Sequence, residues 1–280
     1  MPNAERIQDR IEGAKGFIFD MDGTLALGDA ASGGHVALPG AVALLERIKD
    51  RGTPVRVLTN GTAKPPAAYA ASLRDAGFDL ADEEMMTPST VAAAWLAAHG
   101  VSRVRVLGNA GTAAPLLEAG IEVIAPSAPA RDVEAVYTGW HRDFCFHDLE
   151  AAVRDIWAGA RAVTASHVPF FATREGRGLG TAFPMNVVIR AWTGKRPKVL
   201  GKPSRECFFT ALSLMGLPRS AAAEVVVVGD DPQLETRMAN SVGAISVGVA
   251  TGLVGLGEMR ALGPAERPLL ALESVADLLD

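Results

Sequence analysis

The chain has 280 residues, of which 49% are hydrophobic, and this is enough for one large domain or two ordinary ones with a sizeable core. A net charge of −5 without a basic cluster argues against nucleic-acid binding, and no apolar run is long enough to span a membrane, so we expect no membrane partner. Cys145 and Cys207 lack zinc-ligand spacing, and the polar N-terminal segment lacks the apolar core of a signal peptide, so we expect reduced thiols and a cytoplasmic location.

The first strong element in chain order is residues 16–19, an apolar run that predicts a buried strand of a parallel sheet. It leads into Asp20 and Asp22, two carboxylates separated by one residue, and then at once into Gly23. Ligands of open α/β sheets bind just beyond the carboxyl ends of the strands. Two like charges repel each other there, unless a hard cation lies between them or one of them holds a proton. We therefore predict a functional site at this strand end.

Helix-like and strand-like segments then alternate, which predicts a parallel sheet with crossover helices. Residues 26–39, rich in glycine, alanine and serine, are predicted to form a flap beside the site. Helices are predicted at residues 40–52, 64–77 and 87–100. A second strand, residues 55–58, ends in Thr59, Asn60 and Gly61.

A second series of strands and helices occupies the middle of the chain. Its strands are predicted at residues 103–107, 121–124, 135–138 and 162–165, and its last helix at 182–193. Because this block can form its own sheet and core, residues 86–197 are predicted to be an inserted cap domain. Residues 1–85 and 198–280 would form the catalytic core domain.

Two later segments repeat the design of the first strand end. Residues 199–204 place Lys202 where a turn passes into a helix, and a strand at residues 224–229 ends in Asp230 and Asp231. If all four ends converge, the cleft holds up to four acids, a lysine, a threonine hydroxyl and several backbone amides. That inventory suits a phosphate bound with Mg²⁺: carboxylates and water coordinate the metal, while the lysine, hydroxyl and N–H groups bind phosphoryl oxygens.

Four segments together resemble, in order and spacing, the motifs of the haloacid dehalogenase (HAD) superfamily: Asp20-Met21-Asp22-Gly23-Thr24, Leu58-Thr59-Asn60, Gly201-Lys202-Pro203 and Gly229-Asp230-Asp231. The long stretch between the second and third motifs is similar to the large α/β cap of NagD-like and p-nitrophenylphosphatase-like phosphatases. The resemblance implies an α/β fold, with a Rossmann-like parallel-sheet core and an inserted α/β cap. It also implies a Mg²⁺-dependent phosphatase that acts on a small phosphorylated metabolite, and a cap through which a homodimer could form.

The resemblance implies catalytic roles for the acids. Asp20 would attack phosphorus and become transiently phosphorylated, and Asp22 would protonate the leaving oxygen and then deprotonate the hydrolytic water. Magnesium would be bound by the Asp20 side chain, the backbone carbonyl of Asp22, and Asp230. Asp231 would either hold a water of the metal or cap the following helix. At Glu235 the chain departs from the family, which often has an aspartate near that point.

The resemblance also implies a phosphate-binding set. Lys202 would pair with the nucleophile and the phosphoryl oxygens, and Thr59 would donate its hydroxyl to the phosphate beside the N–H of Asn60. Gly23 and Gly61 would line the same site. The family often has a second asparagine where this chain has Gly61, so contacts from that side chain are lost.

The cap is expected to choose the substrate. Ser166-His167-Val168 stands where related caps commonly carry an Asn-Pro-Asp-like stretch. The following Phe170-Phe171 predicts either a pair that fills the cap core or apolar surface for an aromatic leaving group. Residues 174–180 are predicted to be a flexible loop in which Arg174 and Arg177 either face the substrate or lie on the surface.

Two other patterns are predicted to be structural. Residues 108–111 follow a strand like a nucleotide-binding turn, but they lack the three-glycine spacing and a suitably placed acid. The five histidines show no paired ligand spacing and are predicted to be surface or packing residues, with His167 the strongest exception: His35, His99, His141, His147 and His167.

Three alternative functions stay open on the sequence. A phosphosugar mutase-like phosphotransferase would keep both acids, but it typically has a small helical cap near the first motif, for which residues 26–39 are too short. A dehalogenase would need neither Asp22 nor a metal. A catalytically silent phosphate-binding relative would not need this intact set of acids, threonine and lysine.

Overall fold

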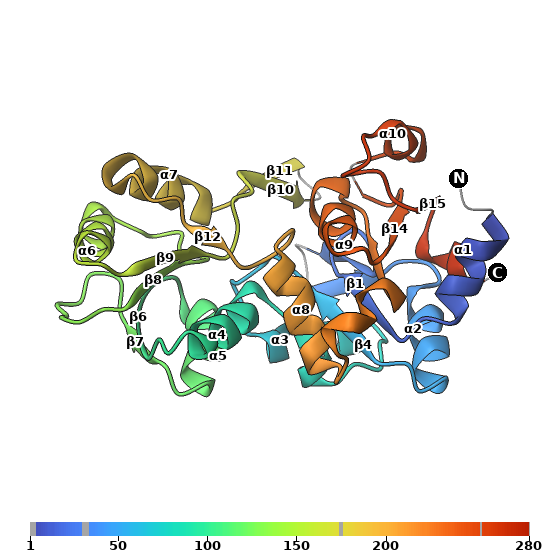
Figure 1. The fold of residues 1–280 in the computed structure, drawn as a ribbon, viewed down its shortest axis with the longest axis horizontal. Coiled ribbons are helices and arrows are strands. Elements are labelled where there is room, and N and C mark those ends of the chain that lie inside the picture. Colours follow the sequence, from blue (N-terminus) through green and yellow to red (C-terminus); the bar gives the residue numbers. More distant parts are fainter. Residues whose placement is uncertain (1–3, 30–33, 174–175, 253, 280) are drawn as a thin grey trace. The chain divides into compact units, whose positions relative to one another are not determined.

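The structure is a computed structural model that describes residues 4–29, 34–173, 176–252 and 254–279 (Figure 1). The chain forms two compact units: the core unit (residues 1–59, 69–86 and 207–280) and the cap unit (residues 60–68 and 87–206). Compared with the predicted domain boundaries, residues 60–68 and 198–206 group with the cap unit. Each unit contains a parallel sheet flanked by helices, so the predicted α/β fold is confirmed.

The core unit is built on a six-stranded parallel sheet in the order β15-β14-β13-β1-β4-β5. The strands are β1 (Gly16–Asp20), β4 (Val55–Leu58), β5 (Met85–Met86), β13 (Val225–Gly229), β14 (Ile245–Val249) and β15 (Leu270–Leu272). Every residue of β1, β13 and β14 is buried, because helices cover both faces of such a sheet. The chain runs outward from β1 to β4 and β5 and later returns to β13 beside β1. The strand order therefore reverses between β1 and β13, which is where open α/β sheets bind ligands.

Alternate residues of the central strands define the main core. Phe17, Phe19, Val226 and Val228 pack in one cluster with apolar residues of three helices, α1 (Ala4–Glu12), α2 (Ala41–Asp50) and α3 (Pro66–Asp75). The remaining helices of this unit are α8 (Arg205–Leu214), α9 (Arg237–Val242) and α10 (Leu256–Ala261). Short helical turns complete it: η1 (Asp82–Glu84), η2 (Arg219–Glu224), η4 (Val275–Leu278) and the π-helical η3 (Pro232–Thr236).

The segment predicted to be a flap forms an antiparallel hairpin of β2 (Ala26–Asp29) and β3 (Gly34–Ala37). Gly28 pairs with His35 in its register. A backbone bridge between Asp22 and Ala26 connects the hairpin directly to the turn after β1. The hairpin therefore begins two residues after the first motif, is joined to it at Asp22, and carries His35 on its second strand.

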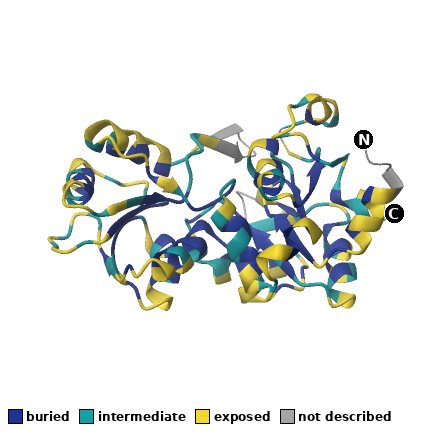
Figure 2. Ribbon diagram, viewed as in Figure 1, coloured by how far each residue is buried: buried dark blue, intermediate teal, exposed yellow. Residues whose placement is uncertain are grey.

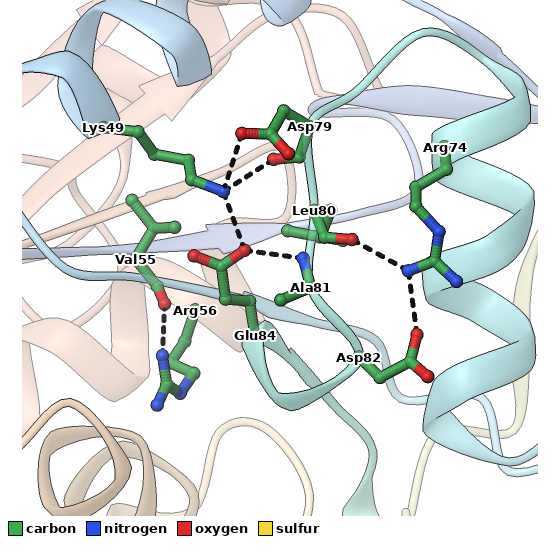
Figure 3. Close-up of polar contacts among 9 residues, drawn as sticks. All are labelled: Lys49, Val55, Arg56, Arg74, Asp79, Leu80, Ala81, Asp82 and Glu84. Atoms are coloured by element: carbon green, nitrogen blue, oxygen red, sulfur yellow. Dashed lines mark hydrogen bonds and ion pairs between the residues drawn. The ribbon is translucent and has the colours of Figure 1, made fainter.

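Ion pairs fix the connection from α3 to β5 (Figure 3). Lys49 of α2 donates to the carbonyl of Asp79 at 2.8 Å and to Oε2 of Glu84 at 3.0 Å, while Arg74 of α3 donates to Asp82 at 2.8 Å. Burial opposes charge on Lys49, but hydrogen bonds and the charges of Glu84 and Asp79 outweigh it and raise its pKa. These contacts hold the loop before β5 against α2 and α3.

The cap unit has a five-stranded parallel sheet in the order β12-β9-β8-β6-β7. Its strands are β6 (Arg103–Leu107), β7 (Glu122–Ile124), β8 (Ala135–Thr138), β9 (Arg161–Thr164) and β12 (Lys198–Val199). Helices α4 (Pro88–Ala98) and α5 (Ala110–Glu118) cover one face, and α6 (Phe146–Trp157) and α7 (Ala182–Thr193) cover the other (Figure 1). In both units the central strands are buried and the outer helix faces are exposed (Figure 2).

One prediction for the cap is wrong. Residues 176–179, predicted to belong to a flexible loop, form β11 (Gly176–Leu179), which pairs antiparallel with β10 (Phe170–Thr173). Glycine-rich composition predicted irregular structure here, but the ladder of backbone hydrogen bonds forms a hairpin.

In the described part of the chain, no helix combines the length and apolar character needed to cross a membrane.

Candidate active site

Asp20 and Asp230 leave neighbouring strands at the same edge of the core sheet. Asp20 is the last residue of β1, Asp230 directly follows β13, and the two strands run parallel with Phe19 opposite Val228. The Asp20 side chain is buried, and the hydroxyl of Thr24 donates to its Oδ2 at 3.3 Å. The reversal of strand order thus brings two of the predicted acids to one edge.

Two glycines leave room for the Asp230 carboxylate. Gly23 has a φ of +87°, and a Cβ atom there would lie 2.5 Å from Oδ2 of Asp230. A Cβ atom on Gly252 would overlap the same oxygen. The N–H of Gly23 donates to the carbonyl of Ala26 at 2.9 Å, so the contribution of Gly23 is space for Asp230 rather than a free amide.

Asp22 has a different environment, because its side chain is 53% exposed. Its two oxygens face two different residues: Oδ2 lies 3.4 Å from the hydroxyl of Thr59, and Oδ1 lies 3.7 Å from Nε2 of His35. Thr59 is buried, and its backbone N–H donates to the carbonyl of Met86 at 3.2 Å. One carboxylate of the first motif is therefore fixed in the interior while the other is open to solvent.

The acids after β13 have contacts within the π-helical turn. Oδ1 of Asp231 accepts the N–H of Gln233 at 2.8 Å, which is the capping alternative that the sequence left open. Glu235 is buried, and its Oε2 accepts the N–H of Asp231 at 3.1 Å. It packs on Gly229, where a Cβ atom would overlap the Glu235 side chain. A metal-binding role for Asp231 stays a prediction.

Lys202, Asn60 and Gly61 belong to the cap unit, whereas Asp20, Asp22, Thr59, Asp230 and Asp231 belong to the core unit. Within the cap unit, the backbone N–H of Lys202 donates to Oδ1 of Asn60 at 2.9 Å, and Nδ2 of Asn60 donates to the carbonyl of Lys202 at 3.1 Å. Gly201 permits this arrangement, because a Cβ atom there would lie 2.6 Å from Oδ1 of Asn60. The Asn60 side chain, to which sequence reasoning gave no role, thus holds the lysine backbone.

The substrate-selecting residues predicted in the cap are only partly described. Arg174 lies outside the described residues, as do the side chains of Phe171 and Arg177. Phe170 is 43% exposed in the β10–β11 hairpin, so it does not fill the cap core. His167 joins a polar network: its Nε2 lies 3.0 Å from the carbonyl of Pro197 and its Nδ1 3.2 Å from Nδ2 of Asn186.

The nucleotide-binding-like turn at residues 108–111 packs against a segment of the same unit. Nδ2 of Asn109 donates to the carbonyl of Ala63 at 2.8 Å, and the hydroxyl of Thr112 donates to the carbonyl of Thr62 at 3.1 Å. A Cβ atom on Gly111 would lie 2.7 Å from the backbone of Ala63. The glycine therefore serves this close packing, in keeping with a structural turn.

The donor set at the core sheet edge fits a hard cation. Among the described residues, no three side chains of His, Cys, Asp or Glu are grouped as a metal site on their own. The predicted metal site needs only two such side chains, the carboxylates of Asp20 and Asp230, because the backbone carbonyl of Asp22 supplies its third ligand. Water and substrate oxygens would fill the remaining positions, as is usual for Mg²⁺. The buried Asp20 and the glycine-lined space around Asp230 are compatible with such a site.

Comparisons with known proteins identify the family to which the chain belongs. A model of the haloacid dehalogenase-like hydrolase family matches residues 17–122, and a second, described as HAD-hydrolase-like, matches residues 199–278. An acid sugar phosphatase of Staphylococcus haemolyticus is 25% identical over 248 residues, which cover 88% of this chain and 89% of the relative.

Solved structures share the fold over almost the whole chain. The glycerol phosphate phosphatase of Mycobacterium tuberculosis, solved with magnesium, has a TM-score of 0.82 at 26% identity. The match covers 96% of this chain and 77% of the phosphatase chain. NagD from E. coli K-12 has a TM-score of 0.81 at 24% identity, and the match covers 94% of this chain and 98% of the NagD chain. The expected similarity to NagD is confirmed, and the chain belongs to the haloacid dehalogenase-like hydrolases.

Proposed function

We propose that this hydrolase is a Mg²⁺-dependent phosphatase that cleaves a small phosphomonoester through a phosphoaspartyl intermediate. The observation that carries the proposal is the pair Asp20 and Asp230 at the reversal of strand order, with Asp22 exposed beside them. The names of the relatives support phosphatase activity, and those of two relatives, an acid sugar phosphatase and a glycerol phosphate phosphatase, favour a sugar or polyol phosphate.

Asp20 is the proposed nucleophile. An oxygen of its carboxylate attacks phosphorus, the bond from phosphorus to the ester oxygen breaks, and the phosphoryl group passes to Asp20. A carboxylate is a weak nucleophile, so alignment supplies much of the rate. Burial at the end of β1 and the hydroxyl of Thr24 at 3.3 Å restrict the Asp20 side chain in the way that alignment requires.

Asp22 is the proposed acid and base. It gives a proton to the leaving ester oxygen, and the resulting carboxylate then takes a proton from the water that attacks the phosphoaspartate. Phosphate leaves, and both carboxylates return to their first state. A residue with this role must reach bulk solvent and the leaving group, and the Asp22 side chain is 53% exposed.

Charge neutralisation is proposed to come from Mg²⁺ and Lys202. Asp20, the Asp22 carbonyl and Asp230 would hold the metal, which when bound offsets the charge of the phosphoryl oxygens. Lys202 and the Thr59 hydroxyl would bind those oxygens, beside the backbone of Asn60 and Gly61. Arg174 and Arg177 stay predicted substrate contacts, as do a homodimer through the cap and a cytoplasmic location.

The test uses p-nitrophenyl phosphate and a panel of sugar and polyol phosphates, with release of inorganic phosphate as the readout. Asp20→Asn should reduce turnover to background, whereas Asp50→Asn, at the exposed end of α2, should keep full activity. Chelation by EDTA should abolish turnover, and added Mg²⁺ should restore it. Full turnover by Asp20→Asn, or by chelated protein, would remove the proposal.

The same panel separates the alternatives. A mutase-like phosphotransferase would produce an isomeric phosphate ester and little inorganic phosphate. A silent phosphate-binding relative would bind phosphate without turnover of any ester.

A further inference from the structure

His35 lies in the part of the chain that the sequence assigned only to a flap, yet its ring reaches the proposed acid and base. Its Nε2 is 3.7 Å from Oδ1 of Asp22, and its side chain is only 7% exposed. The contact arises because β3 pairs with β2 and so returns His35 toward the turn after β1.

A second contact fixes the orientation of the ring. Nδ1 of His35 lies 2.8 Å from the hydroxyl of Ser72 in α3, and the ring of Tyr69, one turn earlier on the same helix, is 6.4 Å away at a tilt of 55°. Ser72 and Tyr69 are both buried. When Nδ1 accepts the serine hydroxyl, the ring proton is on Nε2, the nitrogen that faces Asp22.

We propose that the Ser72–His35 pair is a positioning device for Asp22, which orients the exposed carboxylate for its proton transfers; this rests on the proposed function. Thr59 meets the other oxygen of the same carboxylate at 3.4 Å, so the side chain is approached from two sides. Both distances are longer than ideal hydrogen bonds, and such contacts often shorten when the substrate binds. His35 does not touch the reacting atoms and acts through Asp22.

This role makes different demands on the two chemical steps with p-nitrophenyl phosphate. In the first step Asp20 attacks phosphorus and p-nitrophenolate leaves with the bonding electron pair. This weak base needs no proton, so Asp22 gives its proton to solvent instead and enters the second step as a carboxylate. In the second step water attacks the phosphoaspartate, Asp22 takes the proton of the water, and the bond between phosphorus and Asp20 breaks. Loss of the positioning pair should therefore slow the second step alone.

The experiment is rapid mixing with p-nitrophenyl phosphate, followed by acid quench to measure the phosphorylated protein. In His35→Ala the phosphorylated protein should decay about tenfold more slowly, and kcat and KM should fall together so that kcat/KM is unchanged. His35→Gln, which can offer an N–H near the Nε2 position, should retain most of the decay rate. Ser72→Ala should show part of the loss, and Val36→Ala, an exposed neighbour on β3, should show none.

Three outcomes test the positioning role and the phosphatase proposal separately. Decay at the unsubstituted rate in both His35→Ala and Ser72→Ala overturns the positioning role and leaves the phosphatase proposal standing. An equal fall in nitrophenolate formation and in decay also overturns it, because that indicates general damage to the site. If the unsubstituted protein forms neither nitrophenolate nor phosphorylated protein, the proposed function itself fails. Should His35→Ala not fold, Ser72→Ala, which retains the imidazole but removes the partner of its Nδ1, carries the same test.

Discussion

Asn60 and Lys202 hold each other through two reciprocal hydrogen bonds, although 142 positions separate them in the chain. The amide of Asn60 satisfies both the N–H and the carbonyl of Lys202, so it fixes the backbone of the residue whose amine is proposed to bind phosphate. The second motif thus contributes a side chain that positions the third.

Replacing Asn60 tests this relationship. Asn60→Ala leaves the N–H and carbonyl of Lys202 without these partners, which should cost about 1–3 kcal/mol of stability and lower turnover. Asn60→Asp keeps the oxygen that accepts the Lys202 N–H but loses the donor to its carbonyl, so its effect should be smaller. Urea unfolding and turnover of p-nitrophenyl phosphate provide the two measurements. Identical behaviour of Asn60→Ala and the unsubstituted protein would contradict the positioning role.

Gly252 provides a test of the Asp230 carboxylate. A Cβ atom at this position would overlap Oδ2 of Asp230, so Gly252→Ala should displace the carboxylate and raise the Mg²⁺ concentration needed for half-maximal activity. Gly255→Ala is the matched control, because nothing lies within 4 Å of its Cβ position. A Mg²⁺ titration of activity checks both variants. An unchanged Mg²⁺ requirement in Gly252→Ala would argue against Asp230 as a ligand.

Strands β1 and β13 at the centre of the core sheet could be predicted because they are buried on both faces and read as continuous apolar runs. The acids Asp20 and Asp230 could be predicted because each ends such a run, and parallel strands bring their carboxyl ends to one edge. At these positions the apolar pattern of each strand and the topology of the sheet agree, so the sequence alone was sufficient to place the two acids at one edge.

His35 could not be predicted, because its contact with Asp22 depends on the register of the β2–β3 hairpin and on Ser72 from a helix further along the chain. Histidine spacing in the sequence holds no signal for that geometry. The packing of Ala63 against Gly111 was hidden for a similar reason, since small residues in a connection have no periodic pattern. In both cases tertiary contacts decide the role of the residue.

The pH dependence of cap stability should depend on His167. Burial lowers the pKa of His167, nearby Arg196 and Arg190 lower it further, and the hydrogen bond to the carbonyl of Pro197 opposes them. Its Nδ1 faces the amide of Asn186, which donates, so the neutral ring fits this network. A histidine with a lowered pKa in the folded state favours folding above its unfolded pKa of about 6.5 and loses this contribution as the pH falls.

All four tryptophans lie in the cap unit, so their fluorescence reports its unfolding: Trp95, Trp140, Trp157 and Trp192. The urea concentration at the midpoint of unfolding should be lower at about pH 5.5 than at about pH 7.5, because His167 protonates more readily in the unfolded chain. His167→Gln keeps a donor for Pro197 and removes the titrating group, so its midpoint should change less over the same range. An equal change in both proteins would assign the pH dependence to other groups.

Arg105 should be essential for the stability of the cap unit, although it belongs to none of the four sequence motifs that carry the proposed catalytic residues. Its side chain is 2% exposed, its Nε donates to Asp155 at 2.5 Å, and its Nη1 donates to the carbonyls of Ala125, Pro126 and Ala128. Arg105→Ala removes the buried guanidinium from the Asp155 carboxylate and from these three carbonyls, which should cost about 3–5 kcal/mol. Arg105→Lys cannot reproduce the planar fork of donors and should also destabilise the unit.

Arg154→Ala is the control for this prediction, because Arg154 pairs with Glu150 on the same helix as Asp155 but is 71% exposed. An exposed pair of this kind contributes only about 0.3–0.5 kcal/mol. Tryptophan fluorescence during urea unfolding measures both variants in the same unit. Comparable losses in the two variants would mean that burial does not set the strength of the Arg105 interactions, whereas a loss confined to Arg105 would show that the desolvated guanidinium anchors the loop after β7.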